Sequence, residues 1–247
     1  MGDRIKPVIS DQELFHVHTF RCRHAEEVPD RAYVEKALEL GAKGIWFTDH
    51  CPFPGDLFKR EHRMLYKELP EYINTLKGLK EEYSGRIDIH IGLETEFFQR
   101  YNEMGYYEEL RGNKDIEMLL LGQHMAELPD GRYSYDLDRE SLIEQEFKLL
   151  GTEMILGIQS GYFDAVVHPD RIFRRRPVWD AEMNDMAISI INSVQVASIP
   201  LEQNESSKAV KNYYREEFWE LAKGKTDIIC GLDAHFIREL KLVKNSI

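Results

Sequence analysis

The sequence predicts an α/β fold in which parallel strands alternate with helices in a closed or nearly closed barrel. Seven short apolar segments are separated mostly by segments of helical periodicity, as in parallel strands joined by crossover helices. The length of 247 residues suits one β/α barrel, and no low-complexity linker interrupts the chain. We therefore expect residues 1–247 to form a single domain. An open, doubly wound sheet is the alternative, because one sequence does not reveal strand order.

Each expected element follows from its local sequence. Residues 14–18 are apolar at alternate positions, as in a strand, and residues 44–50 (GIWFTDH) are apolar enough for a buried strand. Residues 28–40 have helical spacing, with Pro29 near the start and Gly41 as a stop. The other expected strands are 87–97, 116–124, 163–168, 196–202 and 227–235, and the other expected helices are 67–83, 101–111, 138–156, 179–194 and 209–222.

The composition restricts the classes of function. A net charge of −12 argues against binding of long nucleic acid, although bound metals could supply positive charge for a small phosphorylated metabolite. The three cysteines, Cys22, Cys51 and Cys230, suggest no disulfide framework and suit a reducing compartment. The N-terminus lacks the apolar stretch of a signal peptide, and no segment has the roughly 18 apolar residues that span a bilayer. We expect a cytoplasmic protein without a membrane partner; the oligomeric state is left open.

Histidines and carboxylates gather at the ends of the expected strands, where the loops of parallel β/α folds converge on the active site. His16 and His18 are two residues apart, as are Asp233 and His235, so a regular strand would place each pair on one face. One such pair is weak evidence, because two polar residues at a strand edge give the same pattern. The whole set predicts a site for more than one zinc, iron or manganese ion. The residues are His16, His18, His50, Glu94, His124, His168, Asp233 and His235.

The motifs around these residues resemble those of the polymerase and histidinol phosphatase (PHP) superfamily, in the same order. They are FHVHT at 15–19, TDH at 48–50, GLE at 92–94, GQH at 122–124, VHPD at 167–170 and GLDAH at 231–235. The longer segment FHVHTFRCRHA, HCPFP at 50–54 and LEQN at 201–204 are similar to the histidinol phosphatase branch. The resemblance implies a distorted (β/α)7 TIM-like barrel with a trinuclear metal site.

The resemblance also implies how the ligands are shared among two to three divalent ions (zinc, iron or manganese). The first metal would be bound by His16, His18, Glu94 and Asp233. Glu94 would bridge to the second metal, which His124 and His168 complete. The third metal would be bound by His24, His50 and His235.

The implied activity is hydrolysis of a small-molecule phosphate monoester by a metal-activated hydroxide, with L-histidinol phosphate as the named substrate. Glu94 and Asp233 are the expected catalytic residues, and Asp233 could orient the attacking water or relay its proton. A phosphodiesterase or nuclease acting on nucleotides or short nucleic acid is one alternative. A non-catalytic metal-binding protein is another.

Arginines and amides near the motifs are candidates for substrate binding. Arg171 follows the VHPD motif, and Arg63 lies in the long loop after the second strand. Asn204 follows a strand end, where a helix cap is an equal alternative. We interpret His90 as a buried, hydrogen-bonded core histidine and Glu96 as a support for a ligand.

Cys22 and Cys51 lie beside expected ligands and could bind zinc, but packing of a small residue is the favoured interpretation.

Overall fold

The computed structural model describes residues 8–55, 62–134 and 146–244, and it contains the seven predicted strands. They are β1 (Glu13–Val17), β2 (Gly44–Phe47), β3 (Asp88–Thr95), β4 (Met118–Leu121), β5 (Ala165–Val166), β6 (Leu201–Asn204) and β7 (Ile228–Gly231). The strands are hydrogen-bonded in sequence order from β1 to β7. Val17 of β1 also forms a parallel bridge with Ala234, just after β7. This strand order is that of a β/α barrel, and it excludes the open doubly wound alternative.

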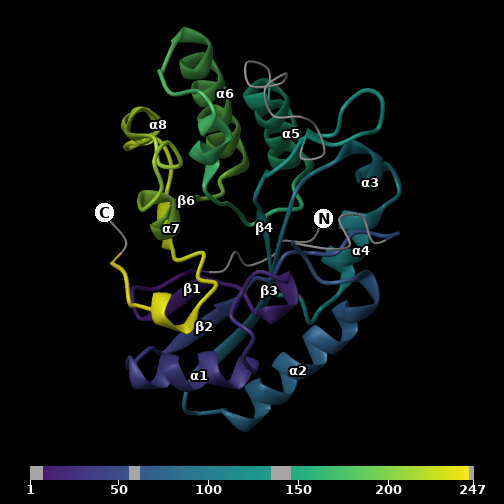
Figure 1. The fold of residues 1–247 in the computed structure, drawn as a ribbon, viewed down its shortest axis with the longest axis vertical. Coiled ribbons are helices and arrows are strands. Elements are labelled where there is room, and N and C mark those ends of the chain that lie inside the picture. The colour runs from purple at the N-terminus through teal and green to yellow at the C-terminus, as the bar shows by residue number, and fades with distance from the viewer. Residues whose placement is uncertain (1–7, 56–61, 135–145, 245–247) are drawn as a thin grey trace. The chain divides into compact units, whose positions relative to one another are not determined.

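Helices connect most of the strands, as the alternation predicted (Figure 1). No helix of the described ranges is both long and apolar enough to cross a lipid bilayer. The α-helices are α1 (Asp30–Glu39), α2 (Leu69–Glu82), α3 (Gln99–Glu103), α4 (Tyr106–Gly112), α5 (Glu146–Ser160), α6 (Ala181–Ala197), α7 (Glu205–Lys208) and α8 (Glu216–Ala222).

The chain divides into two compact units, each built from separate stretches of sequence. Unit 1 comprises residues 1–95, 113–120 and 229–247, and unit 2 comprises residues 96–112 and 121–228. Strands β4 and β7 contribute residues to both units. The expectation of a single domain over residues 1–247 stays a prediction.

Unit 1 is built on the parallel strands β1, β2 and β3, with α1 packed against β2 and α2 against β3 (Figure 1). Strand β2 is apolar and buried at every position, as expected of a parallel strand covered on both faces. The buried residues of α2 recur with the period of a helix, so one stripe of the helix surface faces the sheet. The buried residues of this stripe are Tyr72, Ile73, Leu76 and Leu79.

In unit 2, helices α5 and α6 lie side by side (Figure 1). Glycine at two positions of α5 allows close packing, one against α6 and the other against Leu121 and Phe97. A Cβ at Gly151 would lie 2.3 Å from Sδ of Met186 on α6. A Cβ at Gly157 would lie 2.9 Å from side-chain atoms of Leu121 and Phe97. Any side chain at either position would therefore force the packed neighbours apart.

Several predicted boundaries were wrong, and left-handed backbone explains two of them. Residues 101–111 are not one helix, because Gly105 (φ 77°) separates α3 from α4. Residues 209–215 are not helical, and Asn212 has a φ of 67° within them.

The predicted strand 196–202 begins only at Leu201, since α6 continues to Ala197. The predicted strands 116–124 and 163–168 shorten to β4 and β5. Residues 138–145 of the predicted helix 138–156 lie outside the described residues, and α5 continues to Ser160.

His90 was predicted to be buried in the core, and that part of the prediction was wrong. Its side chain is 22% exposed and stacks on Trp46, with ring centroids 4.0 Å apart. The predicted hydrogen bonding is confirmed, since Nδ1 lies 2.8 Å from Oε2 of Glu117. Nζ of Lys80 donates to the other carboxylate oxygen at 2.7 Å. Glu117 therefore joins α2 and β3 through its two oxygens.

The stability of the protein should depend on the ionisation of Glu117. Burial alone would raise the pKa of this carboxyl, but hydrogen bonds from His90 and Lys80 outweigh burial and lower it to about 2. A carboxyl with a depressed folded-state pKa stabilises the fold above its unfolded pKa of about 4.3, and this contribution is lost as pH falls toward 2. We expect Glu117→Gln to lower the free energy of unfolding by about 2 kcal/mol at pH 6 and by about half of that at pH 3.

Urea unfolding of both proteins across this pH range measures the difference. Asp115→Asn, which removes a partly exposed partner of Lys77, is the matched control. If the difference in the free energy of unfolding between wild type and Glu117→Gln does not change with pH, the stabilising role of ionised Glu117 is contradicted.

Candidate metal centre

His16 and His18 come together at the end of β1, but not through regular strand geometry. His16 has a left-handed φ of 68°, and the pairing of β1 with β2 shifts register between Leu14 and Val17. Both imidazoles are fully buried, with ring centroids 5.0 Å apart. Asp233 is also left-handed, with a φ of 53°, so the predicted strand 227–235 ends at Gly231. Such conformations are costly for residues other than glycine and concentrate at functional sites.

Two carboxylates of unit 1 lie among the histidines. Oε2 of Glu94 lies 3.0 Å from Nδ1 of His50 and 3.5 Å from Nε2 of both His16 and His18. Oδ1 of Asp233 lies 3.2 Å from Nε2 of His18 and 3.8 Å from Nε2 of His16. The strand ends of β1, β2, β3 and β7 thus bring the predicted ligands of unit 1 together.

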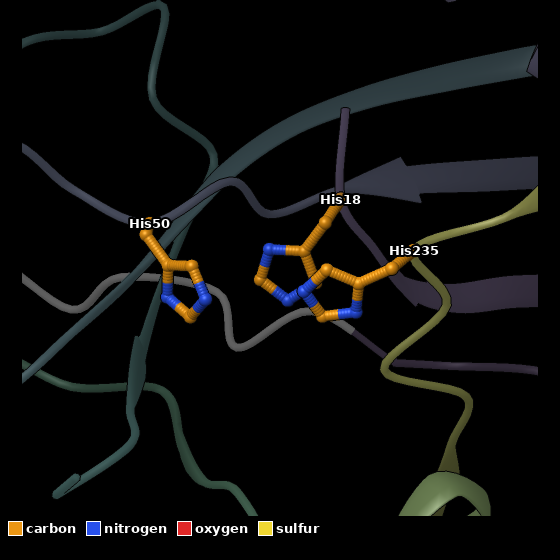
Figure 2. Close-up of side chains that lie close together, drawn as sticks. All are labelled: His18, His50 and His235. Carbon is orange, nitrogen blue, oxygen red and sulfur yellow. The ribbon is translucent and has the colours of Figure 1, made fainter. Parts of the chain in front are cut away.

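His18, His50 and His235 approach one another from three separate segments of the chain (Figure 2). The ring centroid of His18 lies 4.4 Å from that of His50 and 4.3 Å from that of His235. His24 stacks on His235 at 4.5 Å. The sequence placed His24, His50 and His235 around one metal, whereas the structure divides them between two groups that share His235.

Three groups within unit 1 have potential ligand atoms within 4.8 Å of one another. They are His18, His50 and His235; Cys22, His24 and His235; and His16, His18 and Glu94.

Burial favours the neutral form of three of these imidazoles near pH 7. It lowers the pKa of His18, and it lowers the pKa values of His24 and His235 to about 4. A neutral imidazole offers the lone pair that a metal needs. Among the described residues, neither ring nitrogen of His18 has a partner in hydrogen-bonding geometry, and the same holds for Nε2 of His235. Buried nitrogens without hydrogen bonds are costly, and a bound cation would satisfy them.

Backbone carbonyls orient two of the rings. Nδ1 of His24 lies 2.8 Å from the carbonyl oxygen of Cys22, and Nδ1 of His235 lies 3.0 Å from that of Asp233. An Nδ1–H donated to a carbonyl leaves Nε2 as the acceptor, which is the tautomer that binds a metal through Nε2. The residues of unit 1 therefore fit divalent cations.

Asp49 belongs to the TDH motif, but its own role was not predicted. Its carboxylate is fully buried, accepts hydrogen bonds from the backbone N–H (3.0 Å) and hydroxyl of Thr19, and lies 3.8 Å from Nδ1 of His18. Burial raises the pKa of Asp49 to about 7. Thr19 and Asp49 fix the backbone directly after His18. An acidic residue inside the apolar segment GIWFTDH was the available signal.

In unit 2, His124 and His168 lie together, with ring centroids 4.9 Å apart. Nδ1 of His124 is 3.0 Å from Oε1 of Glu96, which is the contact expected of a side chain that supports His124. That His124 binds a metal stays a prediction. His168 has a left-handed φ of 35°, and its backbone N–H donates to Oε2 of buried Glu202 at 3.2 Å. The role of Glu202 was not predicted, although an acidic residue in a buried strand pointed to one.

Arg171 and Asn204, two predicted substrate contacts, also lie together in unit 2. Nη2 of Arg171 donates to Oγ of Ser207 at 2.8 Å and to Oδ1 of Asn204 at 3.4 Å. Oδ1 of Asn204 accepts from the backbone N–H of Ser207 at 2.9 Å, which confirms the alternative that Asn204 caps a helix, here α7. Substrate binding by either residue stays a prediction.

Arg63, the third predicted substrate contact, is buried in unit 1. Its Nη1 donates to the carbonyl oxygen of Cys51 at 2.8 Å, and its guanidinium lies 5.2 Å from the ring centroid of Phe53. These contacts fix the segment after His50, so they assign Arg63 a structural role. Its contact with substrate stays a prediction.

Known proteins resemble this chain in sequence and in fold. A probable histidinol-phosphatase of Deinococcus radiodurans is 33% identical over 162 residues, which cover 63% of this chain and 59% of that protein. The HisK protein of Listeria monocytogenes has a TM-score of 0.73 at 18% identity, covering 92% of this chain and 97% of that chain. A histidinol phosphate phosphatase of Lactococcus lactis subsp. lactis was solved in complex with zinc, L-histidinol and phosphate. It has a TM-score of 0.68 at 21% identity, covering 93% of this chain and 88% of that chain.

The two solved structures, both below 25% identity, establish the fold, and the expected distorted (β/α)7 TIM-like barrel is confirmed. The sequence match to the Deinococcus protein spans less than two thirds of that protein's length. The family model described as the PHP domain matches residues 15–206 and contains most of the motifs that supply the histidine cluster. Because that match covers more than half of the chain, the protein belongs to the PHP domain family.

Proposed function

We propose that this protein is a metal-dependent phosphatase that hydrolyses a small phosphate monoester, with L-histidinol phosphate as its substrate. The observation that carries the proposal is the buried cluster of imidazoles around the carboxylates of Glu94 and Asp233. The Deinococcus relative and the Lactococcus structure support the substrate, since both are described as phosphatases of histidinol phosphate.

The proposed metal ligands in unit 1 are His16, His18, His24, His50, Glu94, Asp233 and His235. Zinc, iron or manganese suits this mixture of imidazole and carboxylate, and we propose two to three ions per chain. Divalent ions at these ligands would supply positive charge for the phosphoryl oxygens and lower the pKa of a nearby water. In unit 2, we propose His124 and His168 as further metal ligands and Arg171 and Asn204 as substrate contacts. Arg63 is proposed as the substrate contact of unit 1.

The protein's own side chains position the reactants. Oδ1 of Asp233 lies 3.2 Å from Nε2 of His18 and is the proposed acceptor of a hydrogen bond from the attacking water. Glu94, which is fully buried, lies close to three histidines and is placed to hold cations where water is excluded. In a water-poor site, a carboxylate attracts a bound cation more strongly than it would in solvent, and the cation in turn would attract the phosphate.

Parallel assays of three phosphate esters test the proposal. We expect purified protein supplied with zinc, manganese or iron to cleave L-histidinol phosphate with a kcat/KM at least about 100-fold above that for p-nitrophenyl phosphate. Bis-p-nitrophenyl phosphate should be a still poorer substrate. Faster cleavage of the diester would overturn the proposal in favour of a phosphodiesterase. Full metal loading without hydrolysis of any ester would indicate a metal-binding protein instead.

A further inference from the structure

Cys22 lies beside two histidines at the edge of the metal centre. It ends the 3-10 helix Phe20–Cys22, which follows β1, and it is fully buried. Its Sγ and one ring nitrogen each of His24 and His235 lie within 4.8 Å of one another. A four-coordinate zinc holds sulfur and nitrogen ligands about 3.5 Å apart, so a small closure of this group would complete three coordination positions.

The surroundings of the sulfur distinguish Cys22 from the other two cysteines. The thiols of Cys51 and Cys230 donate to backbone carbonyls, those of Pro52 and Lys244. Among the described residues, Cys22 is the one cysteine that belongs to a group of potential metal ligands.

The two histidines of the group also have a nitrogen available. Both rings direct Nδ1 at backbone carbonyls, as described above, which leaves Nε2 of each for a ligand. Nε2 of His235 is buried and makes no hydrogen bond within the described part of the chain. A cation shared with Cys22 would give the sulfur and both nitrogens a common role.

We propose that Cys22 is a thiolate ligand of the cation bound by His24 and His235, and that it makes this position selective for zinc. The proposal rests on the metal centre proposed above and adds a ligand and a preferred metal to it. On binding, the thiol loses its proton to solvent and the sulfur–metal bond forms. A soft thiolate favours zinc over manganese, which prefers oxygen and nitrogen ligands.

Cobalt substitution of the whole protein tests the ligand directly. A thiolate bound to Co²⁺ gives a sulfur-to-metal charge-transfer band in the near ultraviolet, which imidazole and carboxylate ligands do not give. We expect the band in the wild type and in Cys230→Ser, and its loss in Cys22→Ser. We also expect Cys22→Ser to bind zinc at this position about 10- to 100-fold more weakly in competition with manganese. Circular dichroism checks that each variant is folded.

X-ray absorption of the zinc-loaded wild type tests the proposal without any substituted protein. A sulfur neighbour at about 2.3 Å from zinc supports the proposal. A zinc shell of nitrogen and oxygen alone, or a charge-transfer band that persists in Cys22→Ser, overturns it. If the wild type still cleaves L-histidinol phosphate in that case, only the role of Cys22 fails. If it neither binds metal nor cleaves phosphate esters, the proposed function fails as well.

Discussion

Replacing Glu94 with alanine is expected to abolish phosphatase activity and to lower the metal content of the protein at the same time. One oxygen of this carboxylate lies within 3.5 Å of ring nitrogens of His16, His18 and His50. This substitution would remove the carboxylate from beside three proposed ligands at once. We expect kcat/KM for L-histidinol phosphate to fall by at least about 10³-fold.

Metal analysis and steady-state kinetics on the same preparation measure both effects. Glu117→Ala is the matched control, because Glu117 also lies 2.8 Å from a histidine nitrogen, that of His90, but outside the proposed metal centre. The control should lose stability and keep its metals and its activity per folded molecule. Full activity in Glu94→Ala would refute the multi-metal interpretation. Full metal content without activity would mean that Glu94 acts in hydrolysis and is not needed for metal binding.

The order of strands and helices was predictable because periodicity and turn residues are local properties of the sequence. Boundaries were less predictable where the backbone turns left-handed at residues other than glycine. His16 and Asp233 show why, since a regular strand was expected at both, yet each has a positive φ. Local sequence does not specify this conformation, and tertiary contacts must maintain it.

The grouping of histidines and carboxylates in unit 1 was predictable because scattered motifs occur in a family's order. Their role as metal ligands stays a prediction. Side chains whose roles depend on burial were harder to interpret. Asp49 hydrogen-bonds to Thr19, the residue after His18, across 30 residues of sequence. Arg63 hydrogen-bonds to the carbonyl of Cys51 across 12 residues. The grouping of Cys22 with His24 and His235 depends likewise on a contact across most of the chain. Spacing along the sequence does not reveal such contacts.

Asp233→Asn is expected to lower kcat by about 10²- to 10⁴-fold while KM changes little, which is the range for loss of a positioned proton acceptor. Asparagine tolerates left-handed backbone about as well as aspartate does, so the φ of 53° at this position adds no strain to the variant. Its amide oxygen can still face His18, but it carries no negative charge and accepts a proton poorly. Alanine here would add backbone strain and confuse the two effects.

Comparison of the Asp233→Asn and Glu94→Ala variants separates metal binding from chemistry. Single-turnover rates, KM and metal content are the measurements, with Asp115→Asn as a charge-matched control outside the centre. If Asp233 orients the attacking water, its variant keeps most of its metal and loses kcat, whereas Glu94→Ala loses both. If Asp233→Asn loses metal in proportion to activity, Asp233 acts chiefly as a ligand. Retention of kcat within about tenfold would exclude it as the proton acceptor and assign that role to another group.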